Sequence, residues 1–450
     1  MAGFWFQQAL LPGGWADGVR VEVTDGVIHA VTPDCAADPT DERHAIALPG
    51  MPNLHSHAFQ RGMAGLAEVR GPGDDSFWTW REVMYRFAHR IGPDEMQAIA
   101  SMAFVEMLEG GFTRVGEFHY IHHDLDGHSY DNPAEMGVRL AASAAETGIG
   151  LTLLPVLYQY GGFGAQAPSE GQKRFINGLD AYARLLERSR AAVAGLPDGL
   201  VGVAPHSLRA VNPASLAQAA LLAEGGPIHI HIAEQIKEVA DCHAWSGQRP
   251  VSWLFDHAPV NAQWCLVHAT HMDAAETARL AASGAVAGLC PITEANLGDG
   301  IFNARDFQAA GGLFGIGSDS NVLIDAAEEL RSMEYAQRLA HRARNVLGRR
   351  DTPSTGRVLF EGALAGGARA LGRAAGLMVG ASADFVTLEA TQPSLAARRG
   401  DGLLDGYIFA GQRMVDGVWR RGRRVVSGGR HVVRDAVAAR YRLALGTILS

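Results

Sequence analysis

Short apolar runs recur through the middle of the chain, and each ends in polar residues before a segment with helical periodicity. There are eight such runs, at residues 48–57, 113–119, 150–159, 202–209, 227–234, 265–271, 285–296 and 312–321. Intervening segments with apolar residues at helical spacing include 94–110, 135–148, 212–224 and 274–283. Eight strand and helix units in succession predict an α/β protein built as a (β/α)8 TIM-like barrel.

A doubly wound open sheet is the alternative arrangement of the same units. That fold commonly carries a GxGxxG turn after its first strand, and no such turn follows residues 48–57. The polar residues that close the runs also fall at the C-terminal ends of the predicted strands. Because a (β/α)8 barrel keeps its chemistry at those ends, the barrel is the preferred prediction.

The two ends of the chain differ from the middle and have the pattern of short strands separated by turns. Such stretches lie at residues 20–23, 27–31, 383–388, 414–419 and 424–426. A discontinuous domain brings the two termini together around a larger insertion. We therefore predict a small β-sandwich domain from residues 1–47 and 376–450, and a catalytic barrel at 48–375.

Composition and charge exclude several classes of partner. The formal net charge of −9 predicts neither nucleic-acid binding nor attraction to an acidic membrane surface. The N-terminus has no secretory signal pattern, and no stretch approaches the roughly 18 apolar residues of a membrane span. Four widely spaced cysteines without a CxxC pair indicate a reducing compartment. We expect a cytoplasmic protein that acts on a small molecule.

Two histidines, His55 and His57, close the first apolar run. Residues i and i+2 of a strand point to the same face, so both imidazoles can reach one point, as a metal ion requires. Three further candidate groups stand at the ends of the fifth, sixth and eighth runs: His231, His268 and Asp319. Neutral imidazoles with one carboxylate suit Zn²⁺ or a similar divalent ion, and Fe²⁺ and Mn²⁺ remain open. His229 has the same spacing to His231 as His55 has to His57, so it competes as a ligand.

The motifs together resemble the amidohydrolase superfamily over essentially the whole chain. They are HxH at 55–57, PH at 205–206, HxAE at 231–234, His268, SDS at 318–320 and the GASADFV segment at 380–386. The resemblance implies four metal ligands: His55, His57, His231 and Asp319. The fourth run has no lysine, so the carboxylated lysine of the binuclear branches has no candidate. We expect one divalent metal ion, with Zn²⁺ as the first candidate.

Glu234, three residues after His231, limits the classes of reaction that the metal site predicts. A carboxylic acid beside an activated water can remove its proton and deliver protons to a nitrogen leaving group. The mononuclear deaminases use the matching glutamate in this way, so the resemblance implies catalytic roles for Glu234, Asp319 and His268. The alternative for Glu234 is an acidic residue that is favoured at a helix N-terminus.

Arg209, three residues after His206, and Arg81 in an aromatic segment indicate the substrate class. A planar guanidinium binds a carboxylate in two-pronged fashion, and two of them suit a dicarboxylate. For Arg81 alone, a solvated helix face remains the alternative.

The segments 55–61, 77–85, 204–211 and 231–235 resemble the formiminoglutamate deiminases of histidine degradation. Members of that family hydrolyse N-formimino-L-glutamate to N-formyl-L-glutamate and ammonia. The resemblance implies Arg81 and Arg209 as carboxylate binders, with Gln60, Tyr120 and His206 also lining the substrate pocket. A formiminoaspartate or heterocycle deaminase and a non-catalytic scaffold barrel stay open as alternatives. A homodimer follows only from family analogy.

Overall fold

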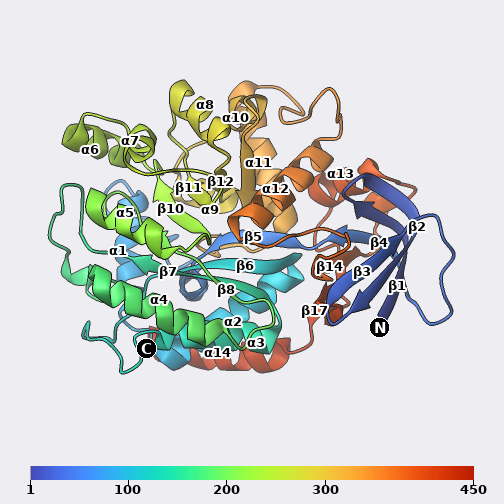
Figure 1. Ribbon diagram of the computed structural model, residues 1–450, viewed down its shortest axis with the longest axis horizontal. Coiled ribbons are helices and arrows are strands. Elements are labelled where there is room, and N and C mark those ends of the chain that lie inside the picture. Colours follow the sequence, from blue (N-terminus) through green and yellow to red (C-terminus); the bar gives the residue numbers. More distant parts are fainter. Residues whose placement is uncertain (1) are drawn as a thin grey trace.

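The computed structural model describes residues 2–450, in which two parallel sheets are surrounded by helices and a larger sheet lies at one end (Figure 1). The first parallel sheet contains β5 (Met51–Ser56), β6 (Phe112–His119), β7 (Gly150–Leu157) and β8 (Leu200–Val201), with β9 (Ala204–Pro205) paired to β7. The second contains β10 (Ile228–Ile232), β11 (Trp264–His268), β12 (Val286–Leu289) and β13 (Leu313–Ile316). β5, β6 and β7 are buried along their whole length, as expected of parallel strands that are covered on both faces.

Parallel bridges connect the two sheets at both shared edges. Ser56 pairs with Asp319 at one edge, and Ser207 pairs with His231 at the other. Each of the eight predicted runs contributes a strand to these sheets. The predicted α/β class and the parallel strands are therefore confirmed, whereas a barrel closed by a continuous ladder stays a prediction.

Helices follow the strands, and several of them begin at a residue whose side chain caps the first turn. They are α1 (Phe77–Ala88), α2 (Pro93–Glu109), α3 (Glu135–Thr147), α4 (Leu179–Val193), α5 (Pro213–Leu222), α6 (Ile236–Ser246), α7 (Pro250–His257), α8 (Ala274–Ser283), α9 (Pro291–Leu297), α10 (Ala304–Ala309), α11 (Ala326–His341), α12 (Thr355–Ala370), α13 (Asp401–Ala410) and α14 (Arg434–Leu449). Three 3₁₀ turns are η1 (Ala58–Met63), η2 (Glu170–Gln172) and η3 (Pro393–Leu395). In α8, for example, the Asp273 side chain accepts from the backbone N–H of Glu276, and Gly284 ends the helix at a φ of +77°.

The strands from the two chain ends meet in one eight-stranded mixed sheet. Its order is β17 (Arg430–His431), β16 (Arg423–Ser427), β15 (Val415–Arg420), β14 (Phe385–Leu388), β4 (Glu42–Pro49), β1 (Ala2–Leu11), β2 (Gly14–Thr24) and β3 (Val27–Thr32). Phe4 and Trp419 lie three strands apart in this order, yet their ring centroids are 6.3 Å apart. Three flat strand spacings would separate them by about 14 Å, so the sheet curls around its own core. The two chain ends thus meet in one sheet, as predicted, and its arrangement as a β-sandwich stays a prediction.

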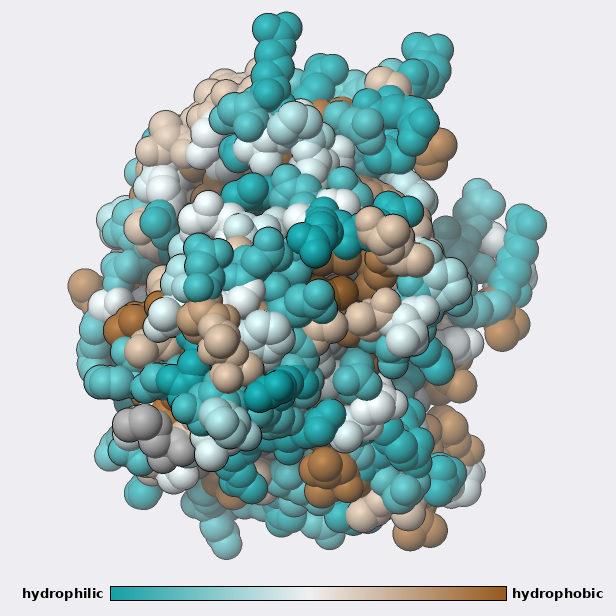
Figure 2. Space-filling view, turned by 90° about the vertical axis from the view of Figure 1, so that its right-hand side faces the viewer, coloured by the Kyte–Doolittle hydropathy of each residue, from teal (hydrophilic) through white to brown (hydrophobic). Residues whose placement is uncertain are grey.

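The outer face of this end of the molecule is largely polar. Figure 2 shows hydrophilic side chains over most of it and hydrophobic ones in small separate groups. The large apolar residues of the sheet, such as Phe6, Phe385 and Trp419, are instead fully buried in its core. Among the helices of residues 2–450, none has the length and apolar composition that crossing a membrane requires.

The last helices lie against helices of the central segment rather than against the curled sheet alone. α14 runs along α2, where Met102, Val105 and Val437 form a small buried cluster (Figure 1). α13 packs on α12 and α11. The domain division at 47/48 and 375/376 stays a prediction, and these helices connect its two parts.

Candidate active site

The backbone takes unusual conformations where β10, β11 and β13 end. Ala233, His268, Ala269 and Asp319 all have positive φ, between +42° and +66°. Residues with a Cβ rarely adopt this left-handed region, and such strain clusters at functional sites. The chain thus turns sharply after each of these strands, and polar side chains stand at the turns.

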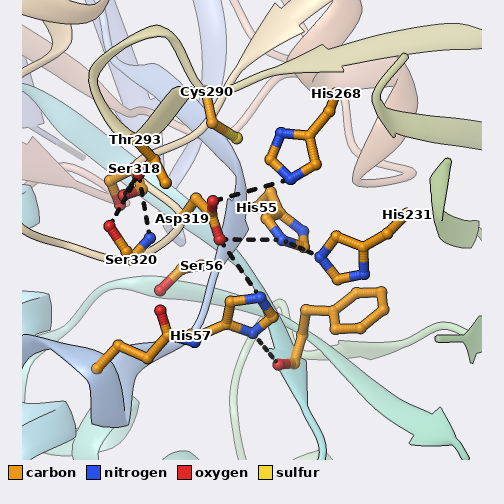
Figure 3. A network of polar contacts seen from close by, with 12 residues as sticks. His55, Ser56, His57, His231, His268, Cys290, Thr293, Ser318, Asp319 and Ser320 are labelled. Atoms are coloured by element: carbon orange, nitrogen blue, oxygen red, sulfur yellow. Dashed lines mark hydrogen bonds and ion pairs between the residues drawn. The ribbon is translucent and has the colours of Figure 1, made fainter. Parts of the chain in front are cut away.

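Four buried residues converge at these strand ends (Figure 3). His55, His57, His231 and Asp319 each offer one ligand atom, and these atoms all lie within 4.8 Å of one another. Oδ1 of Asp319 is 3.3 Å from Nε2 of His57 and 3.5 Å from Nε2 of His55. This is the ligand set that the resemblance to the amidohydrolase superfamily implies.

The hydrogen bonds of the rings fix which nitrogens face the centre. Nδ1 of His57 donates to the carbonyl of Phe118 at 2.8 Å, and Nδ1 of His231 donates to the carbonyl of His206 at 3.0 Å. Each Nε2 is therefore free to act as a ligand. Nε2 of His231 lies 3.1 Å from Nε2 of His55, so lone pairs converge beside a carboxylate. This donor set fits a divalent metal ion.

The charges of the group match that assignment. Burial lowers the pKa of His55 to about 3 and also lowers the pKa values of His57 and His231. Burial opposes ionisation of Asp319, but the hydrogen bond and charge of His55, together with His57, hold its pKa well below the usual value. Neutral imidazoles and an ionised carboxylate are the forms that bind metal.

His229, the competing ligand, lies outside this group. Its Nε2 is buried and bonds the carbonyl of Ala370 at 2.7 Å, where α12 covers the sheet. The described structure thus favours His231 as the ligand from β10.

Glu234 and His268 stand next to the ligand group. Oε1 of Glu234 is 3.7 Å from Nε2 of His268, whose Nδ1 is 3.3 Å from Oε1 of Glu294. Burial raises the pKa of Glu234, although His268 and Arg209 oppose the rise. For His268, burial disfavours the charge, but Glu234, Glu294 and Asp319 outweigh it and raise its pKa. The pair can therefore hold and exchange a proton beside the ligands.

A pocket opens onto these groups. It is lined by every predicted site residue except His55: His57, Gln60, Arg81, Tyr120, His206, Arg209, His231, Glu234, His268 and Asp319. His55 lies beneath them with no exposed surface. Gln60 donates through Nε2 to the hydroxyl of Tyr120 at 3.0 Å, which fixes two of these side chains relative to each other.

Arg81 and Arg209 both line the pocket, and both lie over the indole of Trp78. Their guanidinium carbons lie 4.7 Å and 5.7 Å from its ring centroid. The Nε atoms of both arginines are buried without a hydrogen-bond partner in residues 2–450. Because partly buried guanidinium groups with an unpaired Nε favour anionic partners, this part of the pocket is suited to carboxylates. The alternative of a solvated helix-face arginine does not describe Arg81.

Residues 46–425 match the model of the amidohydrolase family. The chain belongs to the amidohydrolase family. Residues 4–45 match a second model, described as the N-terminal domain of formimidoylglutamate deiminase HutF. The two matches together span the parallel strands and most of the eight-stranded sheet.

Known relatives of this amidohydrolase span its full length. It is 54% identical over 455 residues to formimidoylglutamate deiminase of Pseudomonas aeruginosa, with 100% of both chains covered. It is 26% identical to 8-oxoguanine deaminase of the same organism, over 96% of this chain and 94% of that one. The crystal structure of an amidohydrolase from Brucella melitensis superposes with a TM-score of 0.97 at 55% identity, covering 100% of both chains.

Three residues that sequence reasoning missed support the site of the amidohydrolase. Asn53 accepts from the backbone N–H of Ser318 at 3.0 Å and donates to its hydroxyl at 2.7 Å. Glu117 accepts from the backbone N–H of Ala58 at 2.7 Å, and burial raises its pKa to about 8. Glu294 is the third residue, because its Oε1 lies 3.3 Å from Nδ1 of His268 and so positions that ring. The available signal was a polar residue inside an otherwise apolar run, as at Asn53 and Glu117.

Proposed function

We propose that this amidohydrolase is a formimidoylglutamate deiminase, which hydrolyses N-formimidoyl-L-glutamate to N-formyl-L-glutamate and ammonia in histidine degradation. The observation that carries this conclusion is the 54% identity to a formimidoylglutamate deiminase over the full length of both chains. The reaction adds one water to the formimidoyl carbon and releases its terminal nitrogen as ammonia. The enzyme is thus a metal-dependent hydrolase of a C–N bond.

Four residues would hold one divalent metal ion, for which we propose Zn²⁺: His55, His57, His231 and Asp319. When bound, such an ion acts as a Lewis acid that lowers the pKa of a water molecule toward neutrality. The convergence of ring lone pairs on the Asp319 carboxylate supports this assignment.

Glu234, His268 and Asp319 are proposed as the catalytic residues. The Glu234 carboxylate accepts a proton from the attacking water and passes it to the departing nitrogen. Its raised pKa suits both steps, because a carboxyl group that titrates near neutral pH can take and return a proton. His268, positioned by Glu294, orients the water and donates toward the oxygen as negative charge develops there.

The substrate carboxylates are proposed to bind Arg209 and Arg81. Both guanidinium groups line the same pocket as the ligand group, and neither has an ion-pair partner within residues 2–450. Gln60, Tyr120 and His206 line the same pocket and are proposed to contact the rest of the substrate. A linear dicarboxylate with a formimidoyl group at one end would place its carboxylates at the two arginines and its formimidoyl group at the ligand group.

We further propose the arrangement in which this chemistry takes place. Residues 48–375 form a closed (β/α)8 barrel, and residues 1–47 with 376–450 form the small β domain beside it. The enzyme works in the cytoplasm as a homodimer. Sedimentation at increasing protein concentration tests the dimer, and a single species at the monomer mass would exclude it.

The decisive experiment measures ammonia release by protein of known metal content. Formimidoylglutamate, formimidoylaspartate and guanine are supplied side by side at equal concentration. We expect formimidoylglutamate to give the highest kcat/KM, with N-formylglutamate as the organic product. Preferential release from guanine or from formimidoylaspartate would replace the proposed substrate, and no release from any of them by metal-loaded protein would favour a scaffold.

A further inference from the structure

A second group of ligand-type side chains lies beside the first and shares one member with it. His268, Cys290 and Asp319 are all buried, and their ligand atoms lie within 4.8 Å of one another. Figure 3 shows the thiol of Cys290 and the ring of His268 on the side of Asp319 that faces away from His57. The catalytic proposal uses His268 and Asp319 but leaves Cys290 without a role.

His268 is already held as a metal ligand would be. Its Nδ1 faces Oε1 of Glu294 at 3.3 Å, and its Nε2 points toward Oδ2 of Asp319 at 3.9 Å. Metal-binding histidines commonly have a carboxylate behind one ring nitrogen while the other nitrogen ligates. Nε2 of His268 therefore lies near the carboxylates of both Glu234 and Asp319, and the ligand atoms of His268, Cys290 and Asp319 are close enough to bind one ion.

The electrostatic surroundings of Cys290 favour a cation. Cys290 is a free cysteine with no exposed surface. Burial, followed by the charges of Asp319, Glu294 and Glu329, raises the pKa of its thiol, so the thiol gives up its proton only when a cation takes the proton's place. Oε1 of Glu329 is buried and has no hydrogen-bond partner in residues 2–450. Burial and the neighbouring carboxyl groups raise the pKa of Glu329, and a metal ion bound among these groups would offset their mutual repulsion.

The types of ligand atom determine which cation fits this second group. One thiolate, one imidazole and one carboxylate form a mixed soft and borderline set, which suits Zn²⁺ or Cd²⁺ and not Mg²⁺ or Ca²⁺. Access is available because His268 and Asp319 line the substrate pocket.

We propose that His268, Cys290 and Asp319 form a second, inhibitory metal position for a thiophilic divalent ion, adjacent to the catalytic one and sharing Asp319 with it. An ion there occupies the ring nitrogen that orients water and draws Asp319 away from the first ligand group. Excess Zn²⁺ or Cd²⁺ then inhibits an enzyme whose catalytic position is already filled. The inhibition rests on the proposed function, whereas the binding does not.

Cd²⁺ provides a test that is independent of activity, since a cadmium thiolate absorbs in the ultraviolet. Protein loaded with one Zn²⁺ per chain is titrated with Cd²⁺ while the thiolate absorption and the bound metal are measured. We expect the wild-type chain to take up one further ion with a thiolate band, and Cys290→Ala to lose both. Cys290→Ser serves as a second variant if the alanine variant fails to retain its first Zn²⁺.

Cys35→Ser is the matched control, because Cys35 is the one cysteine of the described chain that is not fully buried. It should keep the band, and loss of the band in Cys35→Ser with retention in Cys290→Ala would overturn the proposal. In ammonia assays, the inhibition constant for Cd²⁺ should rise at least about tenfold in Cys290→Ala. Equal inhibition of Cys35→Ser and Cys290→Ala by Cd²⁺, each relative to its own uninhibited rate, would also overturn the proposal. A chain that binds the second ion but acts on no formimidoyl substrate would refute the proposed function alone.

Discussion

His55 and Asp319 are joined through both backbone and side chain. The N–H of Asp319 donates to the carbonyl of His55 at 3.0 Å, and Oδ1 of Asp319 lies 3.5 Å from Nε2 of His55. The carbonyl of Asp319 also accepts from the N–H of His57 at 2.9 Å. The two parallel sheets are therefore tied together at the residues proposed to bind metal, so metal binding and folding should be linked.

Removal of the metal tests this link. Chelation should abolish ammonia release and lower the melting temperature, because the ion binds the folded ligand group and not the separated residues. A ligand at about 100 times its Kd adds about 2.7 kcal/mol to stability. Differential scanning calorimetry before and after chelation measures the change, and adding Zn²⁺ back should restore both properties. An unchanged melting temperature would show that metal binding at the ligand group does not stabilise the fold.

Asn53→Ala should weaken the metal site without touching a proposed ligand. Asn53 holds both the N–H and the hydroxyl of Ser318, the residue before Asp319. Loss of two buried hydrogen bonds should cost about 2 kcal/mol of unfolding free energy. Metal affinity should fall by about 10-fold to 100-fold, as for other residues that position ligands.

Urea denaturation and competitive chelation measure these two effects. Asn261→Ala is the control, because Asn261 makes a similar bond to the backbone N–H of Gln263 at an exposed turn. Equal losses in the two variants would show that Asn53 does not position Asp319.

Glu234→Gln tests proton transfer. The amide cannot accept the proton of the attacking water, so kcat should fall by at least about 100-fold. Metal content should stay near one ion per chain, because Glu234 is outside the four-residue ligand group. Glu224→Gln, on an exposed side chain, should keep the wild-type rate. A kcat within a few-fold of wild type would remove Glu234 from the mechanism.

Arg209→Met tests recognition of the substrate carboxylate. It should lower kcat/KM for formimidoylglutamate by at least about 100-fold, in keeping with the loss of a buried charge pair. Metal content should not change. Arg86→Met, on the exposed face of α1, is the matched control and should leave kcat/KM unaltered. If Arg209→Met also left it unaltered, the carboxylate would have to bind elsewhere.

Much of this site follows from local sequence pattern. The i, i+2 spacing of His55 and His57 placed both rings on one strand face, and the apolar runs located His231, His268 and Asp319 at strand ends. All of these residues meet in the structure. The alternation of side chains along a strand and the position of residues at strand ends were enough to predict this grouping. Parallel strands of such a fold bring their C-terminal ends to one edge.

Other features depend on contacts between distant segments and were not predictable from pattern. The choice of His231 over His229 rests on the bond of His229 to Ala370 in α12. The common approach of Arg81 and Arg209 to Trp78 joins a helix after the first strand to the end of the fourth. The curl that brings Phe4 to Trp419 likewise arises from packing, since alternation along a strand does not fix sheet curvature.

Asp198→Asn should change the acid dependence of stability, far from the active site. Asp198 is bridged by Arg420 at 2.7 Å and Arg114 at 2.5 Å. Burial opposes its ionisation, but these arginines outweigh that effect and lower its pKa from 3.8 to about 2. Because the folded pKa is below the unfolded one, the stabilisation is complete above about pH 4 and is lost as pH falls toward about 2.

Asp198→Asn should therefore unfold about 2 kcal/mol more easily at neutral pH. The difference from wild type should shrink between about pH 4 and pH 2, where the wild-type carboxylate takes up its proton. Urea denaturation of metal-free protein across this range measures it without a contribution from metal loss in acid. Asp94→Asn is the control, since Asp94 pairs with Arg139 but its side chain is 88% exposed. A deficit in Asp198→Asn that stayed constant from pH 7 to pH 2 would mean that packing, and not the charge of Asp198, stabilises this cluster.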